Sequence, residues 1–204
     1  MSTYYNFYTE ALVDGTWYCI DHRVLQLERN DRPMTYKLNC TYWNGSRSYF
    51  GEAYDKLEEV GRPIRLADTS TEFRMLKILG WRGDDGEVEK YYDRILYTVS
   101  YKDLSELFAK SKQPEYSGIY KKTDINQYEA GELEDLYELD IDPVKYSQLV
   151  DDARAMYQYY EWNDSMSWRV KIPVLYKKVT DRVAEFEDVN CLDCEDVRIL
   201  MYTD

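Results

Sequence analysis

The sequence predicts an α+β protein with a largely antiparallel sheet, N-terminal hairpins and about three to five helices packed on one face. Strand-like runs separated by turn dipeptides come first, and later strand-like runs are each followed by a helix-like run. An apolar share of 44% and an aromatic share of 16% indicate a folded chain, although 32% of the residues are charged. We expect one domain over residues 1–204. The alternative is two units, 1–112 and 113–204, divided at a short polar stretch.

Strands are expected where β-branched and aromatic residues gather between turn signals. The first two runs flank Asp14-Gly15, and the third ends at Asn44-Gly45. Both dipeptides favour two-residue hairpin turns. The expected strands cover residues 4–12, 16–21, 34–43, 48–50, 89–100, 118–122, 168–176 and 197–202.

Helices are expected where a capping residue precedes apolar residues spaced three and four apart. The run from Thr69 to Glu72 fits a capping box. Ser100 and Asp103 can cap the next helix, and Asp142-Pro143 places a cap before a proline at the first helical position. The expected helices cover about 52–59, 73–79, 103–110 and 143–160.

The helix over 143–160 has the most continuous apolar stripe, so we expect it in the core. Its stripe comprises Tyr146, Leu149, Val150, Ala153, Met156, Tyr157 and Tyr160. The run 168–176 instead alternates apolar residues with Arg169 and Lys171, and Lys177 follows it. That alternation is typical of a half-buried strand.

Net charge limits the classes of partner. The chain carries −13 overall, with −3 in residues 1–100 and −10 in residues 101–204. Such a field repels nucleic acid and anionic membranes and favours basic proteins. We therefore expect no direct binding to nucleic acid or membrane. A surface that only confers solubility is the alternative.

An acidic ridge, defined as residues 129–142, contains seven acids and no base. Tyrosine and leucine residues interleave with the acids, which distinguishes the ridge from a disordered acidic tail. An ordered row of carboxylates can imitate the phosphates of a nucleic acid. A solvated face is the other interpretation. The predicted partner-binding residues are Glu129, Glu132, Glu134, Asp135, Tyr137, Glu138 and Asp140.

A second candidate site lies in the basic run that follows residue 168. Arg169, Lys171 and Lys177, with nearby Tyr and Trp residues, could bind a small ligand that bears phosphate. This hypothesis makes the protein a binder that sequesters a nucleotide signal. Pairing of these bases with acids on the last strands is the alternative.

Catalytic signatures do not occur in the sequence. His22 is the single histidine, which removes most acid–base and nucleophilic mechanisms. The common nucleotide-binding glycine loops are also missing. We expect a protein that is not an enzyme and needs no cofactor, with an enzyme of unrecognised type as a third hypothesis.

Cysteine usage favours reduced thiols in the cytoplasm. The pair Cys191 and Cys194 forms a C-x-x-C, and Cys19 with His22 could in principle supply two further zinc ligands. Acidic neighbours disfavour a redox role for the pair. We expect no metal site, and instead two cysteines flanking a turn between strands. The sequence has neither a recognisable secretory signal nor an apolar run of membrane-spanning length, so neither feature suggests another compartment.

Three features together resemble the small acidic proteins with which bacterial viruses block host defence, such as anti-CRISPR proteins. They are the Tyr-rich opening 4–21, the acidic ridge, and the acid-flanked stretch 185–196. The resemblance lies in composition and assigns no site residue. It implies a compact protein without catalytic machinery that occupies the nucleic-acid channel of a nuclease. We therefore expect an inhibitor that binds a basic host protein, such as a nuclease complex, in the cytoplasm of a bacterial host cell.

Overall fold

A computed structural model of the chain describes residues 5–26, 35–39, 42–44, 47–74, 96–133, 135–136 and 155–203. Its main element is a six-stranded antiparallel sheet with the order β2-β1-β10-β7-β6, in which β5 also pairs with β1. The predicted α+β class is confirmed. The strands of this sheet are β1 (Tyr5–Val13), β2 (Thr16–Cys19), β5 (Tyr42–Asn44), β6 (Arg62–Ile64), β7 (Leu96–Ser100) and β10 (Asp196–Thr203).

The N-terminal hairpin forms where the sequence predicts it. Asp14 and Gly15 connect β1 to β2 and have positive φ angles of 47° and 68°. Two successive residues with positive φ angles match a type I′ turn. The twist of such a turn fits the twist of the two strands that it joins. β3 (His22–Gln26) and β4 (Thr35–Asn39) then form a separate two-stranded sheet. The strand expected over 34–43 is thus divided between β4 and β5, which have different partners.

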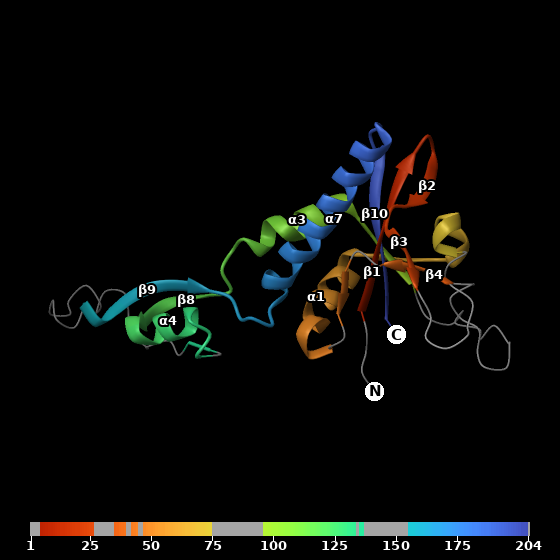
Figure 1. Ribbon diagram of the computed structural model, residues 1–204. Helices are drawn as coiled ribbons and strands as arrows, with labels where there is room; N and C mark the ends of the chain where they lie inside the picture. The colour runs from red at the N-terminus through yellow and green to blue at the C-terminus, as the bar shows by residue number, and fades with distance from the viewer. Residues whose placement is uncertain are drawn as a thin grey trace, which may run out of the picture.

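Three helices cover one face of the main sheet (Figure 1). They are α1 (Arg47–Val60), α3 (Tyr101–Ser111) and α7 (Trp168–Asn190). The largest core cluster lies between them and the sheet. It includes Phe7, Leu57, Val99, Leu104, Ile172, Leu175 and Ile199. On the opposite face, Tyr8 and Leu200 pack with Phe73, which belongs to a helical segment at 71–74 that follows the short 3₁₀ helix η1 (Leu66–Asp68).

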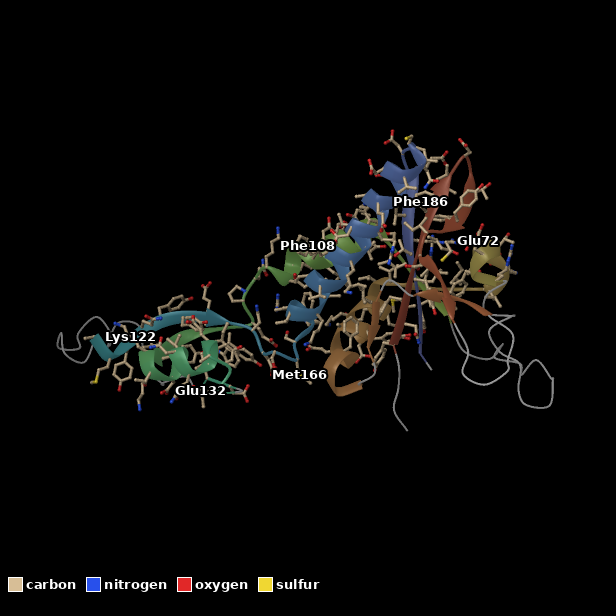
Figure 2. The ribbon with its side chains drawn as sticks, in the orientation of Figure 1. Glu72, Phe108, Lys122, Glu132, Met166 and Phe186 are labelled. Atoms are coloured by element: carbon tan, nitrogen blue, oxygen red, sulfur yellow. The ribbon has the colours of Figure 1, made fainter. Side chains whose placement is uncertain are left out.

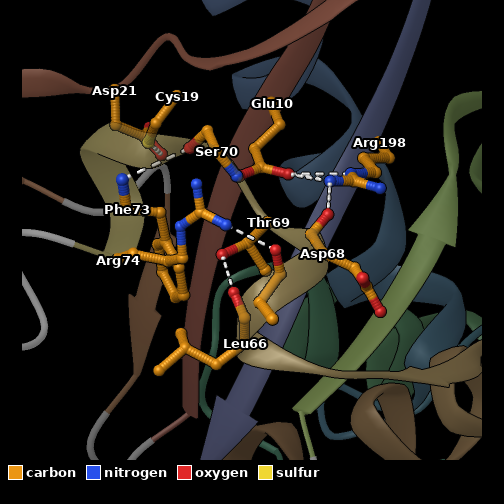
Figure 3. A network of polar contacts seen from close by, with 11 residues as sticks. Glu10, Cys19, Asp21, Leu66, Asp68, Thr69, Ser70, Phe73, Arg74 and Arg198 are labelled. Atoms are coloured by element: carbon orange, nitrogen blue, oxygen red, sulfur yellow. Dashed lines mark hydrogen bonds and ion pairs between the residues drawn. The ribbon is translucent and has the colours of Figure 1, made fainter.

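A buried ion pair joins the two central strands on that opposite face (Figure 3). Glu10 of β1 lies directly across from Arg198 of β10, which donates from Nε to Glu10 Oε2 at 2.7 Å. Ser70 donates its backbone N–H to the other carboxylate oxygen, at 2.6 Å. The guanidinium also donates to the Asp68 carbonyl and lies 3.9 Å from the centre of the Trp17 ring. Both carboxylate oxygens and two guanidinium nitrogens of the pair therefore have polar partners, as buried charges require.

A second structural unit, which we call the arm, extends away from the main sheet (Figure 1). It comprises the described residues between 114 and 166. Its elements are β8 (Tyr116–Lys121), α4 (Lys122–Glu129) and β9 (Tyr157–Trp162), and β8 pairs antiparallel with β9. The arm has its own small core of Tyr120, Ile125, Leu136 and Trp162. The rest of the described chain, which we call the body, takes strands from both ends of the sequence, because β10 pairs with β1.

The expected strand over 168–176 is wrong, because these residues form the first part of α7. Ser167 caps this helix by accepting from the backbone N–H of Arg169. Ile172, Leu175 and Val179 are buried at three- and four-residue spacing, whereas Val170 and Val174 are exposed. The residues that pack onto the sheet follow helical spacing, and this packing outweighs the alternation of apolar and polar residues over 168–176.

The expected core helix over 143–160 is wrong at its C-terminal end. Residues 157–160 belong to β9, and Met156 is 58% exposed. Residues 143–154, including Leu149, lie outside the described residues. The tyrosines of β9 pair with β8, a contact that a helical periodicity cannot indicate.

Two helix starts differ from the expected ones, and one agrees. The α1 helix begins at Arg47, so residues 48–50 are helical and do not form a strand. Ser70, and not Thr69, accepts from the backbone N–H of Phe73. The cap at Ser100 is confirmed, because its side chain accepts from the backbone N–H of Asp103. β7 is described from Leu96, and the earlier part of the expected strand lies outside the described residues.

Candidate partner-binding surface

Most of the protein's net charge belongs to the segment 113–166, of which the described residues form the arm. Residues 113–166 contain thirteen acids and four bases, a net charge of −9. The remaining residues carry −4 of the total of −13. The described residues of the arm contain seven acids and two bases, a net charge of −5. Charge concentrated on a projecting unit produces a directional field, which steers the approach of a charged partner.

The first part of the acidic ridge follows the end of α4. Glu129 is in the last turn of this helix, and both Glu132 and Asp135 are exposed beyond it. Figure 2 shows Glu132 at the surface of the arm, beside α4. A carboxylate at a helix C-terminus faces the negative end of the helix dipole, so Glu129 gains no stability from the dipole. The helix dipole therefore does not account for the acids at this end of α4.

The chain after α4 is held in place by a turn and by an apolar anchor. Gly131 has a φ angle of 73°, a left-handed conformation that glycine adopts without strain. The backbone N–H of Glu132 donates to the carbonyl of Gln127 at 2.8 Å. Leu136 is buried in the arm core. The ridge is thus ordered at Glu132 and Asp135, whereas the other predicted partner-binding residues, Glu134, Tyr137, Glu138 and Asp140, lie outside the described residues.

Aromatic residues connect the ridge to the arm core. Tyr160 donates from its hydroxyl to Glu129 Oε1 at 3.1 Å. Burial, and then this hydrogen bond to a carboxylate, raise the pKa of Tyr160. Tyr128 donates to the carbonyl of Asn163 at 2.8 Å and packs edge-on against Trp162. Within the described residues no base forms an ion pair with an acid of the arm.

Large apolar side chains are exposed on the same unit. Tyr159 is 58% exposed, as is Met156 beside it, and Leu133 lies at the surface between Glu132 and the end of the ridge. Tyr116 is 43% exposed and stacks on Trp162, with ring centres 4.7 Å apart and planes inclined by 28°. Exposed aromatic rings are typical of protein-binding surfaces, where a few such residues contribute much of the binding energy.

No protein-family model, curated protein or solved structure matches this chain. Among the described helices, none is long and apolar enough to cross a membrane.

The three residues of the second candidate site are separated by the helical structure of α7. Arg169 donates to the carbonyls of Lys110 and Gln113 at 2.8 and 3.1 Å, which satisfies the end of α3. Lys171 is only 3% exposed. Lys177 is exposed and pairs with Asp181 one helical turn further on, at 2.6 Å.

The spacing along α7 also separates these charges. Eight residues of helix place Arg169 and Lys177 about 12 Å apart along the axis. A phosphate group needs several donors that converge within hydrogen-bond distance. The structure does not bring these three residues together on one exposed surface, and Arg169 acts instead at the junction of arm and body.

The cysteine pair lies between α7 and β10, and not between two strands as expected. Cys191 is exposed and ends α7 with a positive φ angle of 53°. Burial, and then the carboxylate of Glu187, raise the pKa of Cys194 to about 11. Burial and the negative charge of Asp21 raise the pKa of Cys19 above its usual range. Thiols with raised pKa values are weak nucleophiles and poor metal ligands at neutral pH.

Metal ligands do not gather in the described part of the chain. Among the described residues, no group of three or more His, Cys, Asp and Glu side chains could hold an ion. Cys40 and the side chain of His22 lie outside the described residues, so the expectation of a protein without a metal site stays a prediction.

The stacked rings of Tyr116 and Trp162 are not among the residues that the sequence predicts for the site. The two residues are direct partners across β8 and β9 but lie 46 positions apart in the chain. One signal was available: Tyr116 and Tyr120, like Tyr160 and Trp162, have the even spacing that places side chains on one face of a strand.

Proposed function

We propose that this protein is a non-enzymatic inhibitor that binds the basic, nucleic-acid-binding surface of a host protein. The partner would be a nuclease complex of a bacterial defence system, and the protein would act in the cytoplasm of the host cell. This is the mode of action that the resemblance to anti-CRISPR proteins implies. The observation that carries the proposal is the arm, a projecting unit whose described residues have a net charge of −5 and include exposed aromatic rings.

Electrostatics supports the competition with nucleic acid. A groove that binds DNA presents many Lys and Arg side chains, and an ordered row of carboxylates can displace the phosphates from them. Complementary charge accelerates the encounter, and buried aromatic contacts then slow dissociation. Neither effect requires a catalytic residue.

The first experiment asks whether the protein displaces DNA from a nuclease. Purified CRISPR-associated nucleases are loaded with labelled target DNA, and fluorescence anisotropy reports displacement while gel assays report cleavage. We expect displacement from at least one nuclease, with an affinity that falls by roughly an order of magnitude or more between 50 and 200 mM salt. If the protein displaces DNA from none of the nucleases in the panel, the proposal is contradicted.

The second experiment places the interaction on the arm. The variant Glu132→Lys/Asp135→Lys changes two exposed acids of the ridge, and the control Asp55→Lys/Glu106→Lys makes the same change in net charge on α1 and α3. We expect the arm variant to weaken inhibition at least roughly ten-fold through a slower association rate, with the control close to the parent. Equal losses in the two variants would show that only total charge matters.

Folding is checked separately from binding. The ridge acids form no ion pair within the described residues, so their replacement should leave thermal stability unchanged or slightly raised. A variant that inhibits poorly and also has a much lower melting temperature than the parent does not test binding by itself. Its inhibition is then measured well below its melting temperature.

A further inference from the structure

The base of the arm presents an aromatic ring whose surroundings identify what it can bind. One face of Tyr116 lies on Trp162, which is itself buried and held edge-on by Tyr128. The indole of Trp162 donates to the hydroxyl of Tyr120 at 3.1 Å, so the ring beneath Tyr116 has a fixed orientation. Because Tyr116 is nevertheless 43% exposed, its outer face is available to a partner.

Acids from separate segments lie near enough to the Tyr116 hydroxyl to act on it. The negative charge of Glu115, followed by partial burial and then by Asp164, Asp135 and Glu52, raises the pKa of Tyr116. Glu52 comes from α1 of the body, where it also accepts from the backbone N–H of Trp168. In the described part of the chain, none of these four acids has an ion-pair partner.

The connections between arm and body hold this arrangement together. The backbone N–H of Glu115 donates to the side chain of Asn163 at 2.8 Å, which joins the chain entering the arm to the chain leaving it. Asp164 accepts from the backbone N–H of Met166 at 2.7 Å. Figure 2 shows Met166 at this junction. Two of the acids around the ring are thus placed by backbone contacts and not by flexible side chains alone.

Charge complementarity selects one class of occupant. A nucleobase could stack on the ring, but its phosphates would be repelled by four carboxylates. A second copy of this chain would bring another arm of the same charge. A guanidinium stacks on an aromatic face and donates to carboxylates in its own plane, so it satisfies both features of the surface.

We propose that the outer face of Tyr116, which is stacked on Trp162, binds an arginine side chain of the basic partner, with nearby carboxylates of the arm accepting from the guanidinium. This inference rests on the proposed function and specifies the chemistry by which the arm recognises its target. It predicts a preference for arginine over lysine, because an ammonium group is compact, strongly hydrated and unable to stack.

The test uses labelled octa-arginine and octa-lysine peptides as probes, with binding measured by fluorescence anisotropy at 150 mM salt. We expect the parent protein to prefer octa-arginine. Tyr116→Leu should weaken octa-arginine binding roughly two- to five-fold, and the preference over octa-lysine should largely disappear. Tyr116→Phe keeps the ring and should bind like the parent.

The matched control is Tyr159→Leu, which removes another exposed tyrosine from the arm. Tyr159 donates to Glu161 and lies opposite Ile119, on the other face of the hairpin from Tyr116. We expect it to leave octa-arginine binding unchanged. Equal effects of Tyr116→Leu and Tyr159→Leu, or equal affinity of the parent for the two peptides, would overturn the inference.

The outcomes separate this inference from the proposed function. If Tyr116→Leu changes nothing while Glu132→Lys/Asp135→Lys abolishes DNA displacement, the function stands and the arginine site is wrong. If the peptide results hold while no nuclease is inhibited, the arginine site stands and the nuclease target is wrong. Binding of a mononucleotide, or self-association, that depends on Tyr116 would also overturn the inference.

Discussion

The buried pair of Glu10 and Arg198 makes the sharpest prediction about stability. Glu10 is completely buried, and Arg198 provides its Nε and a second guanidinium nitrogen, at 2.7 and 2.6 Å, to one carboxylate oxygen. The variant Arg198→Met removes both donors and leaves the carboxylate unpaired between the two central strands. Breaking such a pair typically costs about 3–5 kcal/mol of the free energy of unfolding. That is a large share of the roughly 5–15 kcal/mol available to a domain.

The double variant Glu10→Leu/Arg198→Met distinguishes an unpaired charge from lost packing. It removes both charges while keeping side chains of similar volume, so we expect a free energy of unfolding within about 2 kcal/mol of the parent. The single variant Glu10→Leu should cost less than Arg198→Met, since the guanidinium keeps its contacts with Trp17 and the Asp68 carbonyl.

Urea unfolding at pH 7, monitored by circular dichroism, gives the free energy of unfolding of all three variants. The same slope of free energy against urea concentration is expected for each of them. The double variant should be more stable than the sum of the two single effects predicts, by about 2 kcal/mol. Additive effects, or a cost below about 1 kcal/mol for Arg198→Met, would refute the assignment of a tightly coupled buried pair.

Further predictions concern the two cores, one turn and the thiols. Leu175→Ala in the body core should lower the free energy of unfolding by about 2–5 kcal/mol in urea. Ile125→Ala in the arm core should leave that transition within about 1 kcal/mol while accelerating amide exchange in the arm; a large global loss would contradict separate cores. Gly15→Val should cost about 1–2 kcal/mol in thermal unfolding, because its φ angle is 68°; no loss would refute a strained turn. Iodoacetamide at pH 8 should modify Cys191 before Cys194, whose pKa burial raises to about 11, and mass spectrometry that found equal rates would refute this order.

Local signals in the sequence were sufficient for the elements that depend on few residues. The turn at Asp14 and Gly15 needs only two residues with positive φ angles, and the cap at Ser100 needs one side chain and a nearby N–H. Both were predicted from the sequence and both are confirmed. The fold class follows from the same kind of information.

The error at α7 has a different cause, because the segment satisfies two periodicities. Trp168, Ile172 and Tyr176 belong both to an alternating pattern and to a helical stripe that continues to Val179 and Phe186. Only the longer window distinguishes the two, since the apolar residues after 176 keep helical spacing. Packing against α1, α3 and the sheet then decides the outcome.

The candidate site was predictable in its charge but not in its shape. The acids of the ridge are evident in the sequence, and Glu129, Glu132 and Asp135 are indeed exposed. The projection of the arm depends instead on pairing between β8 and β9, whose residues lie about 40 positions apart. The even spacing of aromatic residues within each strand was the one local signal for the stacked ring of Tyr116, and it does not identify the partner strand.

The place of β10 in the sheet constrains how the protein folds while it is being synthesised. β10 follows every other strand in the chain, yet it lies between β1 and β7 at the centre of the main sheet. A nascent chain on the ribosome therefore exposes two incomplete sheet edges until β10 emerges, whereas the arm, formed by nearer neighbours, can fold earlier. During that interval the unpaired edge of β1 is open to incorrect pairing with other chains. Chaperone demand should thus depend on the time between translation of β7 and translation of β10, and synonymous codons that slow this interval should increase aggregation.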